Sequence, residues 1–335
     1  MSSSDKKPQV RSVSILGTGS AVPDRVLTNH DLEALVDTSD DWIVARTGIR
    51  ERRIADDKTA ASDLATAAAR RALESSGITA DQLDTIVVCT VTADYQFPST
   101  ACLVQAAIGA PRAYCMDLAA ACSGFLYGTE VARGLIGAGL ANHVLVIGVE
   151  MLSKFMNWQD RGVCILFGDA AGAAIIGPHN GRGEILATYL GADGTSAELI
   201  ELPAGGSRHP ITHEAIDLQQ HHFHMKGNEV FKLGVRGMEE ACRRVLDRAG
   251  VTPADVSLLV PHQANTRIID ATAQRLELPP ERVYLNIQKY GNTSAASVPL
   301  ALDEARREGR LHEGDLVLMV AFGAGLTWGA SLVRW

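Results

Sequence analysis

The ten residues RRALESSGIT at positions 70–79 recur without gaps as RRVLDRAGVT at positions 243–252. Each copy has the pattern of a helix end, a glycine that closes the helix, and the approach to a strand. The two copies lie 243 − 70 = 173 residues apart, and the segments VLVI at 144–147 and VLMV at 317–320 keep the same offset. This repeated spacing predicts that the chain consists of two fused copies of one α/β unit.

Short apolar runs alternate with amphipathic stretches in both copies. The runs predict buried strands at 13–16, 85–89, 144–149, 256–260 and 316–320, and the stretches predict helices at 62–76, 125–136, 230–249, 266–276 and 299–308. The alternation predicts a largely parallel sheet with helices on both faces. The two halves, 1–180 and 181–335, meet where nothing resembles a linker, so we expect them to pack into one body.

The composition is that of a globular protein with a large core. Of 335 residues, 46% are hydrophobic and 21% charged, which excludes a disordered chain. The net charge of −8 argues against nucleic-acid binding. No apolar stretch approaches the roughly 18 residues that span a bilayer, and the polar residues 1–10 precede no signal-peptide core. We therefore expect a cytoplasmic protein that does not enter the membrane.

Metal and disulfide chemistry are not expected from the cysteines and histidines. The six cysteines are scattered without a CxxC pair, which is typical of neither a zinc site nor a disulfide framework. Residues 204–225 form a long loop-like stretch with five histidines, whose spacing matches no standard metal site. We interpret this stretch as a solvated lid over a binding site.

Three residues at predicted strand ends suggest nucleophilic chemistry. Cys122 follows a strand at the start of a helix, where the helix dipole favours a thiolate and predicts a lowered pKa. His262 follows the buried strand 256–260, and Asn292 lies in a glycine-containing turn before a helix. Alone, each residue is more often a packing or turn residue. Together at strand ends, where α/β sheets bind ligands, they predict a nucleophile with two hydrogen-bonding partners in a cleft between the halves.

The chain resembles the β-ketoacyl-acyl-carrier-protein synthase III family of the thiolase superfamily from Val13 to Trp335. The motifs that carry the resemblance are NHDL at 29–32, DTSDDWI at 37–43, RTGIRER at 46–52, FGD at 167–169, GNEVFK at 227–232 and LTWG at 326–329, together with the segments around Cys122, His262 and Asn292. The resemblance implies a thiolase-like fold, in which two duplicated halves form a five-layer αβαβα sandwich, and a homodimer.

The resemblance also implies an acyltransferase that starts fatty-acid synthesis. Cys122 would accept the acyl group of an acyl-CoA primer, and decarboxylation of malonyl-acyl-carrier protein would then give a β-ketoacyl product. His262 and Asn292 would complete the triad and donate hydrogen bonds to the enolate oxygen. The backbone amides of Cys122 and Ala324 would form the oxyanion hole; some members have glycine at the position of Ala324. No metal or redox cofactor is implied.

Further residues match the family's substrate contacts. Trp42 and Arg161 resemble the pair that sandwiches the adenine of coenzyme A. Phe97 resembles the residue that crosses the dimer to line the partner's acyl pocket, which predicts primers of up to about four or five carbons. The remaining matches are to phosphate, carrier-protein and pantetheine contacts: Arg46, Arg267, Lys232, Gly227 and Asn265.

Three other functions remain open on the sequence. One alternative is a related acyltransferase of secondary metabolism or quinolone synthesis that makes a different bond, which the matches to docking residues disfavour. A cysteine hydrolase would use the same triad, but it would not release carbon dioxide from a malonyl thioester. An inactive binding subunit is disfavoured because all three triad residues are present.

Overall fold

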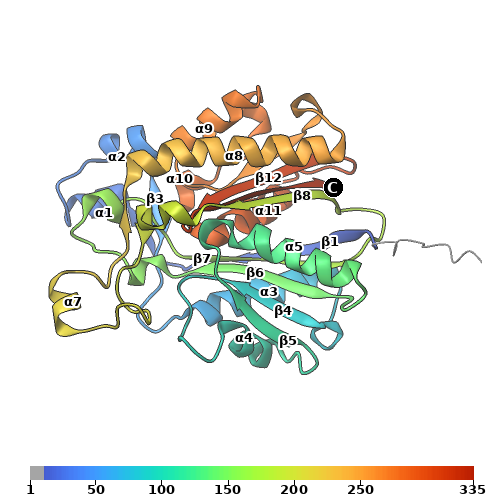
Figure 1. Cartoon of the computed structure of the whole chain (residues 1–335), viewed down its shortest axis with the longest axis horizontal. Coiled ribbons are helices and arrows are strands. Elements are labelled where there is room, and N and C mark those ends of the chain that lie inside the picture. The colour runs from blue at the N-terminus through green and yellow to red at the C-terminus, as the bar shows by residue number, and fades with distance from the viewer. Residues whose placement is uncertain (1–10) are drawn as a thin grey trace, which may run out of the picture.

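Residues 11–335, described by a computed structural model, form five alternating layers of helices and sheet (Figure 1). Residues 1–10, which entered the prediction of location, lie outside the described range. One outer layer holds α8 (Gly227–Ala249) and α9 (Thr266–Arg275), and the other holds α3 (Ala61–Ser76) and α4 (Thr100–Ile108). The middle layer holds α5 (Gly124–Gly137) and α11 (Ser297–Arg307). The predicted five-layer thiolase-like architecture is confirmed.

The two sheet layers follow from strands that are apolar on both faces. In β4 (Thr85–Cys89), Val87 packs in the central core with α5 and α11, whereas Ile86 and Val88 pack toward α3. In β12 (Leu316–Gly323), alternate residues likewise face the central core and the core under α8. Successive side chains of a strand point to opposite faces, so a continuous apolar run can join two cores.

The nine main strands run in the order β11-β12-β13-β8-β1-β7-β6-β4-β5. The strands not yet bounded are β1 (Val13–Ala21), β5 (Tyr114–Leu118), β6 (Val144–Glu150), β7 (Ala170–Pro178), β8 (Glu184–Ala192), β11 (Leu258–Pro261) and β13 (Thr327–Arg334). The two sheet layers are linked through a single residue pair, Ser14 of β1 with Glu184 of β8. Glu184 lies close to residue 180, where the sequence predicts the boundary between the two halves.

The prediction of a largely parallel sheet is wrong. Only the pairs β4–β5, β4–β6 and β11–β12 are parallel, and the other main pairings are antiparallel. The prediction omitted β7, β8 and β13, which enter the sheets without a crossover helix. Strand β13 follows β12 after three residues, so the two form a hairpin.

The duplication extends to the turns that precede the central helices. The 3₁₀ turn Ala121–Ser123 leads into α5, and the 3₁₀ turn Ser294–Ala296 leads into α11. Their offset is 294 − 121 = 173 residues, the same as in the sequence repeat. Ala121 and Ser294 also share an unusual left-handed backbone, with φ of 45° and 47°. Each turn packs against a strand of the other half, the first on β12 and the second on β6.

Shorter elements surround one end of the sheets. They are β2 (Val26–Thr28), α1 (Asn29–Glu33), α2 (Asp40–Thr47), β3 (Glu51–Arg53), α6 (Arg161–Cys164), β9 (Ile200–Glu201), α7 (His213–Asp217), β10 (His224–Met225) and α10 (Ile287–Tyr290). The stretch 204–225 contains α7, which projects from the body at the left of Figure 1. Over residues 11–335, no helix combines the length and the apolar character needed to cross a membrane.

Candidate active site

A cavity of about 740 Å³ brings most of the predicted site residues together. Its wall is mainly apolar and comes from both halves of the chain. The predicted residues that line it are Trp42, Arg46, Cys122, Gly227, Lys232, His262, Asn265, Arg267, Asn292 and Ala324. The other two, Arg161 and Phe97, lie outside its wall.

Cys122 lies in the turn directly before α5, at the position that the sequence predicted. Its predicted lowered pKa is wrong, because burial raises the pKa of the thiol to about 12. An interaction with the Ser294 side chain lowers the pKa but does not offset the burial. Removing the thiolate from water therefore outweighs the helix dipole. At neutral pH the resting site holds a thiol.

His262 is a neutral, oriented imidazole. It follows β11, is almost fully buried, and its burial lowers the pKa to about 3. Its Nδ1 lies 2.6 Å from the hydroxyl of Ser297, which also accepts a hydrogen bond from the Gln263 amide at 3.4 Å. Because Ser297 accepts from the Gln263 amide, its own hydrogen is available for Nδ1. This arrangement favours the tautomer with hydrogen on Nε2.

Asn292 is fixed so that its amide nitrogen is available for a ligand. Its backbone amide donates to the carbonyl of Leu166 at 2.8 Å, and its carbonyl accepts from the amide of Gly168 at 3.1 Å. The side-chain Oδ1 accepts a hydrogen bond from the Ser294 amide at 2.9 Å. The side-chain oxygen is thereby occupied, and the NH₂ group is the donor that remains at the cavity wall.

The segment after β12 brings a second backbone close to Cys122. A Cβ atom on Gly323 would lie 2.6 Å from the Cys122 amide nitrogen, so only glycine allows this approach. Ala324 borders the cavity without a positive φ, and its carbonyl accepts a hydrogen bond from the Thr327 hydroxyl at 3.0 Å. Alanine therefore keeps an unstrained backbone amide at the position predicted for the oxyanion hole.

Two arginine side chains pack against the indole ring of Trp42. The guanidinium carbon of Arg46 lies 4.1 Å from the ring centroid, and that of Arg161 lies 4.6 Å from it. Arg161 is also held by the Asp37 carbonyl at 2.7 Å. Because Arg161 already contacts the ring, a planar group can be sandwiched between Trp42 and Arg161 only if the arginine moves aside.

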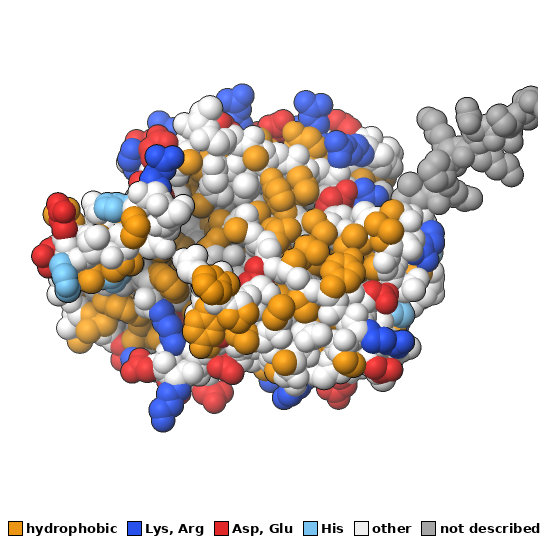
Figure 2. Space-filling view, turned by 60° about the horizontal axis from the view of Figure 1, so that its bottom comes forward, with side chains coloured by type: hydrophobic (Ala, Val, Ile, Leu, Met, Phe, Trp, Pro, Cys, Tyr) orange, Lys and Arg blue, Asp and Glu red, His pale blue; other side chains and the backbone are white. Residues whose placement is uncertain are grey.

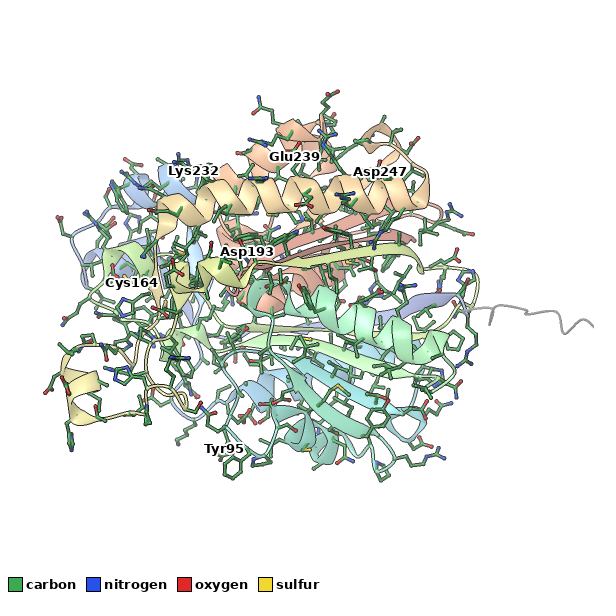
Figure 3. All side chains as sticks on the ribbon, viewed as in Figure 1. Tyr95, Cys164, Asp193, Lys232, Glu239 and Asp247 are labelled. Atoms are coloured by element: carbon green, nitrogen blue, oxygen red, sulfur yellow. The ribbon has the colours of Figure 1, made fainter. Side chains whose placement is uncertain are left out.

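The residues predicted to contact pantetheine and the carrier protein lie on α8 and α9. Gly227 begins α8, and Lys232 lies one turn further along (Figure 3). Asn265 caps α9 by accepting a hydrogen bond from the Ile268 amide, so it also has a purely structural role. The Arg267 guanidinium lies 5.5 Å from the ring centroid of Phe231.

Phe97 projects from the surface of the single chain. Its side chain is 86% exposed, and the nearby Tyr95 is 62% exposed and points away from the body (Figure 3). Hydrophobic side chains gather across the middle of the face shown in Figure 2, with charged groups mainly at its rim. Phe97 therefore contributes nothing to the cavity of its own chain.

Sequence reasoning missed several residues of the cavity. The stretch 204–225, interpreted as solvated, places Phe223 and Met225 in the cavity wall, where the Phe223 ring packs edge-on against Phe167. Ser294 follows Asn292 by two residues and carries no sequence signal of its own, and Glu150 ends an ordinary apolar strand. Within residues 11–335, no group of three His, Cys, Asp or Glu side chains is placed to hold a metal ion.

Comparison with known proteins gives a consistent family. Models described as 3-oxoacyl-[acyl-carrier-protein] synthase III, and its C-terminal part, match residues 116–194 and 246–335. β-Ketoacyl-[acyl-carrier-protein] synthase III of Symbiobacterium thermophilum is 56% identical over 98% of this chain and 99% of its own, and that of Caldanaerobacter subterraneus is 55% identical over 96% and 97%.

A solved structure agrees. That of 3-oxoacyl-[acyl-carrier-protein] synthase III from Aquifex aeolicus superposes with a TM-score of 0.89 at 50% identity, covering 96% of this chain and all of the other. The chain therefore belongs to the β-ketoacyl-acyl-carrier-protein synthase III family.

Proposed function

We propose that this protein condenses an acyl-CoA primer with malonyl-acyl-carrier protein and so initiates fatty-acid synthesis. Carbon dioxide is lost, and the product is a β-ketoacyl-acyl-carrier protein. The observation that carries the proposal is the meeting of Cys122, His262 and Asn292 in one apolar cavity, in a chain of this family. The reaction needs no metal or redox cofactor.

The first half-reaction transfers the acyl group to Cys122. The sulfur attacks the thioester carbonyl of the primer, and coenzyme A leaves. Negative charge develops on the carbonyl oxygen, where the backbone amides of Cys122 and Ala324 stabilise it. The attack requires a thiolate, so the thiol proton must leave Cys122 first.

The second half-reaction forms the new carbon–carbon bond. Decarboxylation of the malonyl group leaves an enolate, whose oxygen accepts hydrogen bonds from Nε2–H of His262 and the NH₂ group of Asn292. Both donors are neutral and held in place before the substrate arrives, by Ser297 and by the Ser294 amide. The carbanion then attacks the acyl thioester on Cys122. The apolar wall limits hydrolysis of that thioester.

Substrate binding is assigned to the cavity mouth. Trp42 and Arg161 hold the adenine after Arg161 moves aside, and Arg46 lies near the phosphates. Lys232 and Arg267 provide positive charge for an acidic carrier protein, which steers the encounter. Gly227 and Asn265 flank the pantetheine arm that reaches Cys122.

We also propose that the protein is a cytoplasmic homodimer. Strand β5 is at the edge of its sheet, and the unpaired backbone groups of an edge strand can pair with another chain. Tyr114 of this strand is exposed, and so are Tyr95 and Phe97 in the segment before α4, whose first two residues donate hydrogen bonds to Asp117 of β5. In the dimer, Phe97 of each chain would close the acyl pocket of the other.

Peptide mass spectrometry of the acyl-enzyme tests the proposed function. The protein is incubated with acyl-CoAs of different length, and the acyl mass on Cys122 is measured before and after malonyl-acyl-carrier protein is added. We expect acyl-Cys122 to form and then disappear as carbon dioxide and β-ketoacyl product appear. Cys122→Ser should abolish both steps. Thioester hydrolysis without carbon dioxide release would instead support a cysteine hydrolase.

A further inference from the structure

Glu150 is a fully buried carboxyl group that the mechanism above does not use. It ends β6 and has no solvent-exposed surface. Its Oε2 lies 2.5 Å from the Thr92 hydroxyl, and both oxygens lie 3.3 Å from the Val91 amide. No Lys or Arg of residues 11–335 forms an ion pair with it. A buried acid without a cation is costly to ionise and calls for an explanation.

One hydroxyl connects this carboxyl group to the nucleophile. The Oγ of Ser294 lies 3.2 Å from Oε1 of Glu150, and the turn Ser294–Ala296 packs against the turn Ala121–Ser123, which contains Cys122. Ser294 and Cys122 both line the cavity. The left-handed backbone of Ser294 and the bond from its amide to Asn292 fix its position. A hydroxyl has one hydrogen, so Ser294 can donate to Glu150 or to Cys122, but not to both.

We propose that Cys122 and Glu150 carry one negative charge between them. A proton that moves from Cys122 through Ser294 to Glu150 transfers this charge from the carboxylate to the sulfur. The Sγ–H bond of Cys122 breaks and the proton joins the Ser294 oxygen, while the hydrogen of Ser294 passes to Oε1 of Glu150. Thiol plus carboxylate become thiolate plus carboxylic acid, and the total charge stays at −1. Ser294 then donates its hydrogen bond to the thiolate. Glu150 acts through Ser294 and is a positioning residue.

The electrostatics of the site agree with this exchange. Burial raises the pKa of Glu150 to about 7, and Glu150 in turn raises the pKa of Cys122. His262, with its pKa lowered to about 3, is a poorer proton acceptor than Glu150. The other titratable group that responds to Glu150 is the thiol of Cys89, which burial keeps protonated. The proton therefore has a nearby acceptor that leaves His262 neutral for the enolate.

A shared charge gives a distinctive pH profile. In the proposed path, one hydrogen bond from Cys122 to Ser294 and one from Ser294 to Glu150 would span about 6 Å, and at an effective dielectric constant of about 20 this separation couples the two ionisations by roughly 2 pH units. Below pH 7 the thiolate population of Cys122 should rise about tenfold per pH unit. Between about pH 7 and 9 it should be constant, because the pair has already lost its one proton and the second loss is delayed.

Alkylation of Cys122 by iodoacetamide measures this population directly. The rate is read at Cys122 alone by peptide mass spectrometry, in the full-length protein, from pH 5.5 to 10. The inference rests on the proposed function for the role of the thiolate in condensation. The measurement itself does not depend on that function, since alkylation needs neither acyl-CoA nor carrier protein. A protein that failed to condense would therefore still give a decisive profile.

Glu150→Gln is the main variant. Its amide can donate to Ser294 as the carboxylic acid does, but it cannot ionise. In the wild type, the plot of alkylation rate against pH should bend near pH 7, where the rise gives way to a plateau. In Glu150→Gln we expect this bend to vanish and alkylation at pH 9 to be on the order of 100 times faster than in the wild type. Ser294→Ala should slow alkylation by roughly tenfold or more, because the thiolate loses a donor.

Two further variants make the test decisive. Asp169→Asn is the matched control: Asp169 is also buried and accepts a serine hydroxyl, from Ser153, but has no contact with Ser294. Its bend should match that of the wild type. Thr92→Val retains Glu150 but removes the hydrogen bond that most lowers its pKa, so the bend should move to higher pH. Should Glu150→Gln fail to fold, Thr92→Val decides alone. A wild-type profile without a bend, an unchanged bend in Glu150→Gln or Thr92→Val, or a lost bend in Asp169→Asn would each overturn the proposal.

Discussion

Replacing Asn292 should separate the two half-reactions. Its Oδ1 is occupied by the Ser294 amide, so the NH₂ group is what the side chain offers a substrate. Asn292→Ala removes that donor from the enolate oxygen while leaving Cys122 and the oxyanion amides in place. Acylation of Cys122 should therefore persist, and decarboxylation of the malonyl group should fail.

The size of the effect follows from the number of donors. The enolate oxygen receives two, from His262 and Asn292, and loss of one preorganised donor lowers the rate on the order of 10²–10³-fold, or about 2.7–4 kcal/mol. Acylation should change by less than about tenfold. The double variant with His262→Ala should be little slower than the slower single variant, because both donors act on one atom.

Asn292→Asp distinguishes this catalytic role from a structural one. The aspartate keeps an oxygen for the Ser294 amide, whereas alanine leaves that buried amide unpaired at a cost of about 1–3 kcal/mol in the free energy of unfolding. Asn292→Asp should therefore keep the hydrogen bond from the Ser294 amide and yet be no better at decarboxylation than Asn292→Ala, since it replaces a donor with negative charge.

The assay quantifies acyl-Cys122 by mass spectrometry and carbon dioxide from labelled malonyl-acyl-carrier protein in the same preparations. Thermal unfolding is measured in parallel, with the exposed Asn142→Ala as a control. Wild-type decarboxylation by Asn292→Asp would refute the reasoning. Loss of acylation with intact decarboxylation in Asn292→Ala would refute it equally.

Three other predictions concern binding, specificity and stability. Arg267→Glu should raise KM for the acidic carrier protein more than KM for acyl-CoA, with added salt weakening the wild-type interaction in the same sense; equal losses would place Arg267 on the shared path. Octanoyl-CoA should be a poor primer in the wild type and a better one in Phe97→Ala, as measured by acyl-Cys122 formation; efficient wild-type use would contradict the role of Phe97. Because burial raises the pKa of Glu150 from 4.5 to about 7, the folded state binds this proton more tightly than the unfolded chain, and stability falls as pH rises through that interval. Chemical denaturation should therefore show Glu150→Gln gaining roughly 2–3 kcal/mol relative to the wild type between pH 5 and pH 8, and a pH-independent difference would be inconsistent with a buried, ionising Glu150.

The sequence predicts most of this architecture because helix ends and buried strands leave local signals. The repeat at 70–79 and 243–252 predicts the duplication, and the strand at 85–89 has the same bounds in the structure. Strand β7 was missed because its sequence AAGAAIIGP is rich in alanine and glycine, which do not favour strands. Its place is set by tertiary packing between β1 and β6.

The candidate site shows a similar limit. The positions of Cys122, His262 and Asn292 at element boundaries could be predicted from local sequence, but the pKa of Cys122 could not. That pKa depends on enclosure by the cavity and on Ser294 and Glu150, which are 172 and 28 residues away in the chain. The local sequence indicates the helix dipole at Cys122 but not the dielectric environment of the cavity, and that environment has the larger effect on the pKa.

The two turns that precede the central helices are equivalent in the duplication but contribute different side chains to the site. Register by register, Cys122 of the first turn corresponds to Ala295 of the second, and Ser294 of the second corresponds to Ala121 of the first. One copy keeps the nucleophile and the other keeps the hydroxyl proposed to donate to it, and each turn packs on a strand of the opposite half. A half-length gene product could therefore assemble such a site only by pairing with a second copy of itself. Fusion into one chain freed the two turns to mutate independently, so asymmetry at the catalytic centre is a product of the duplication itself.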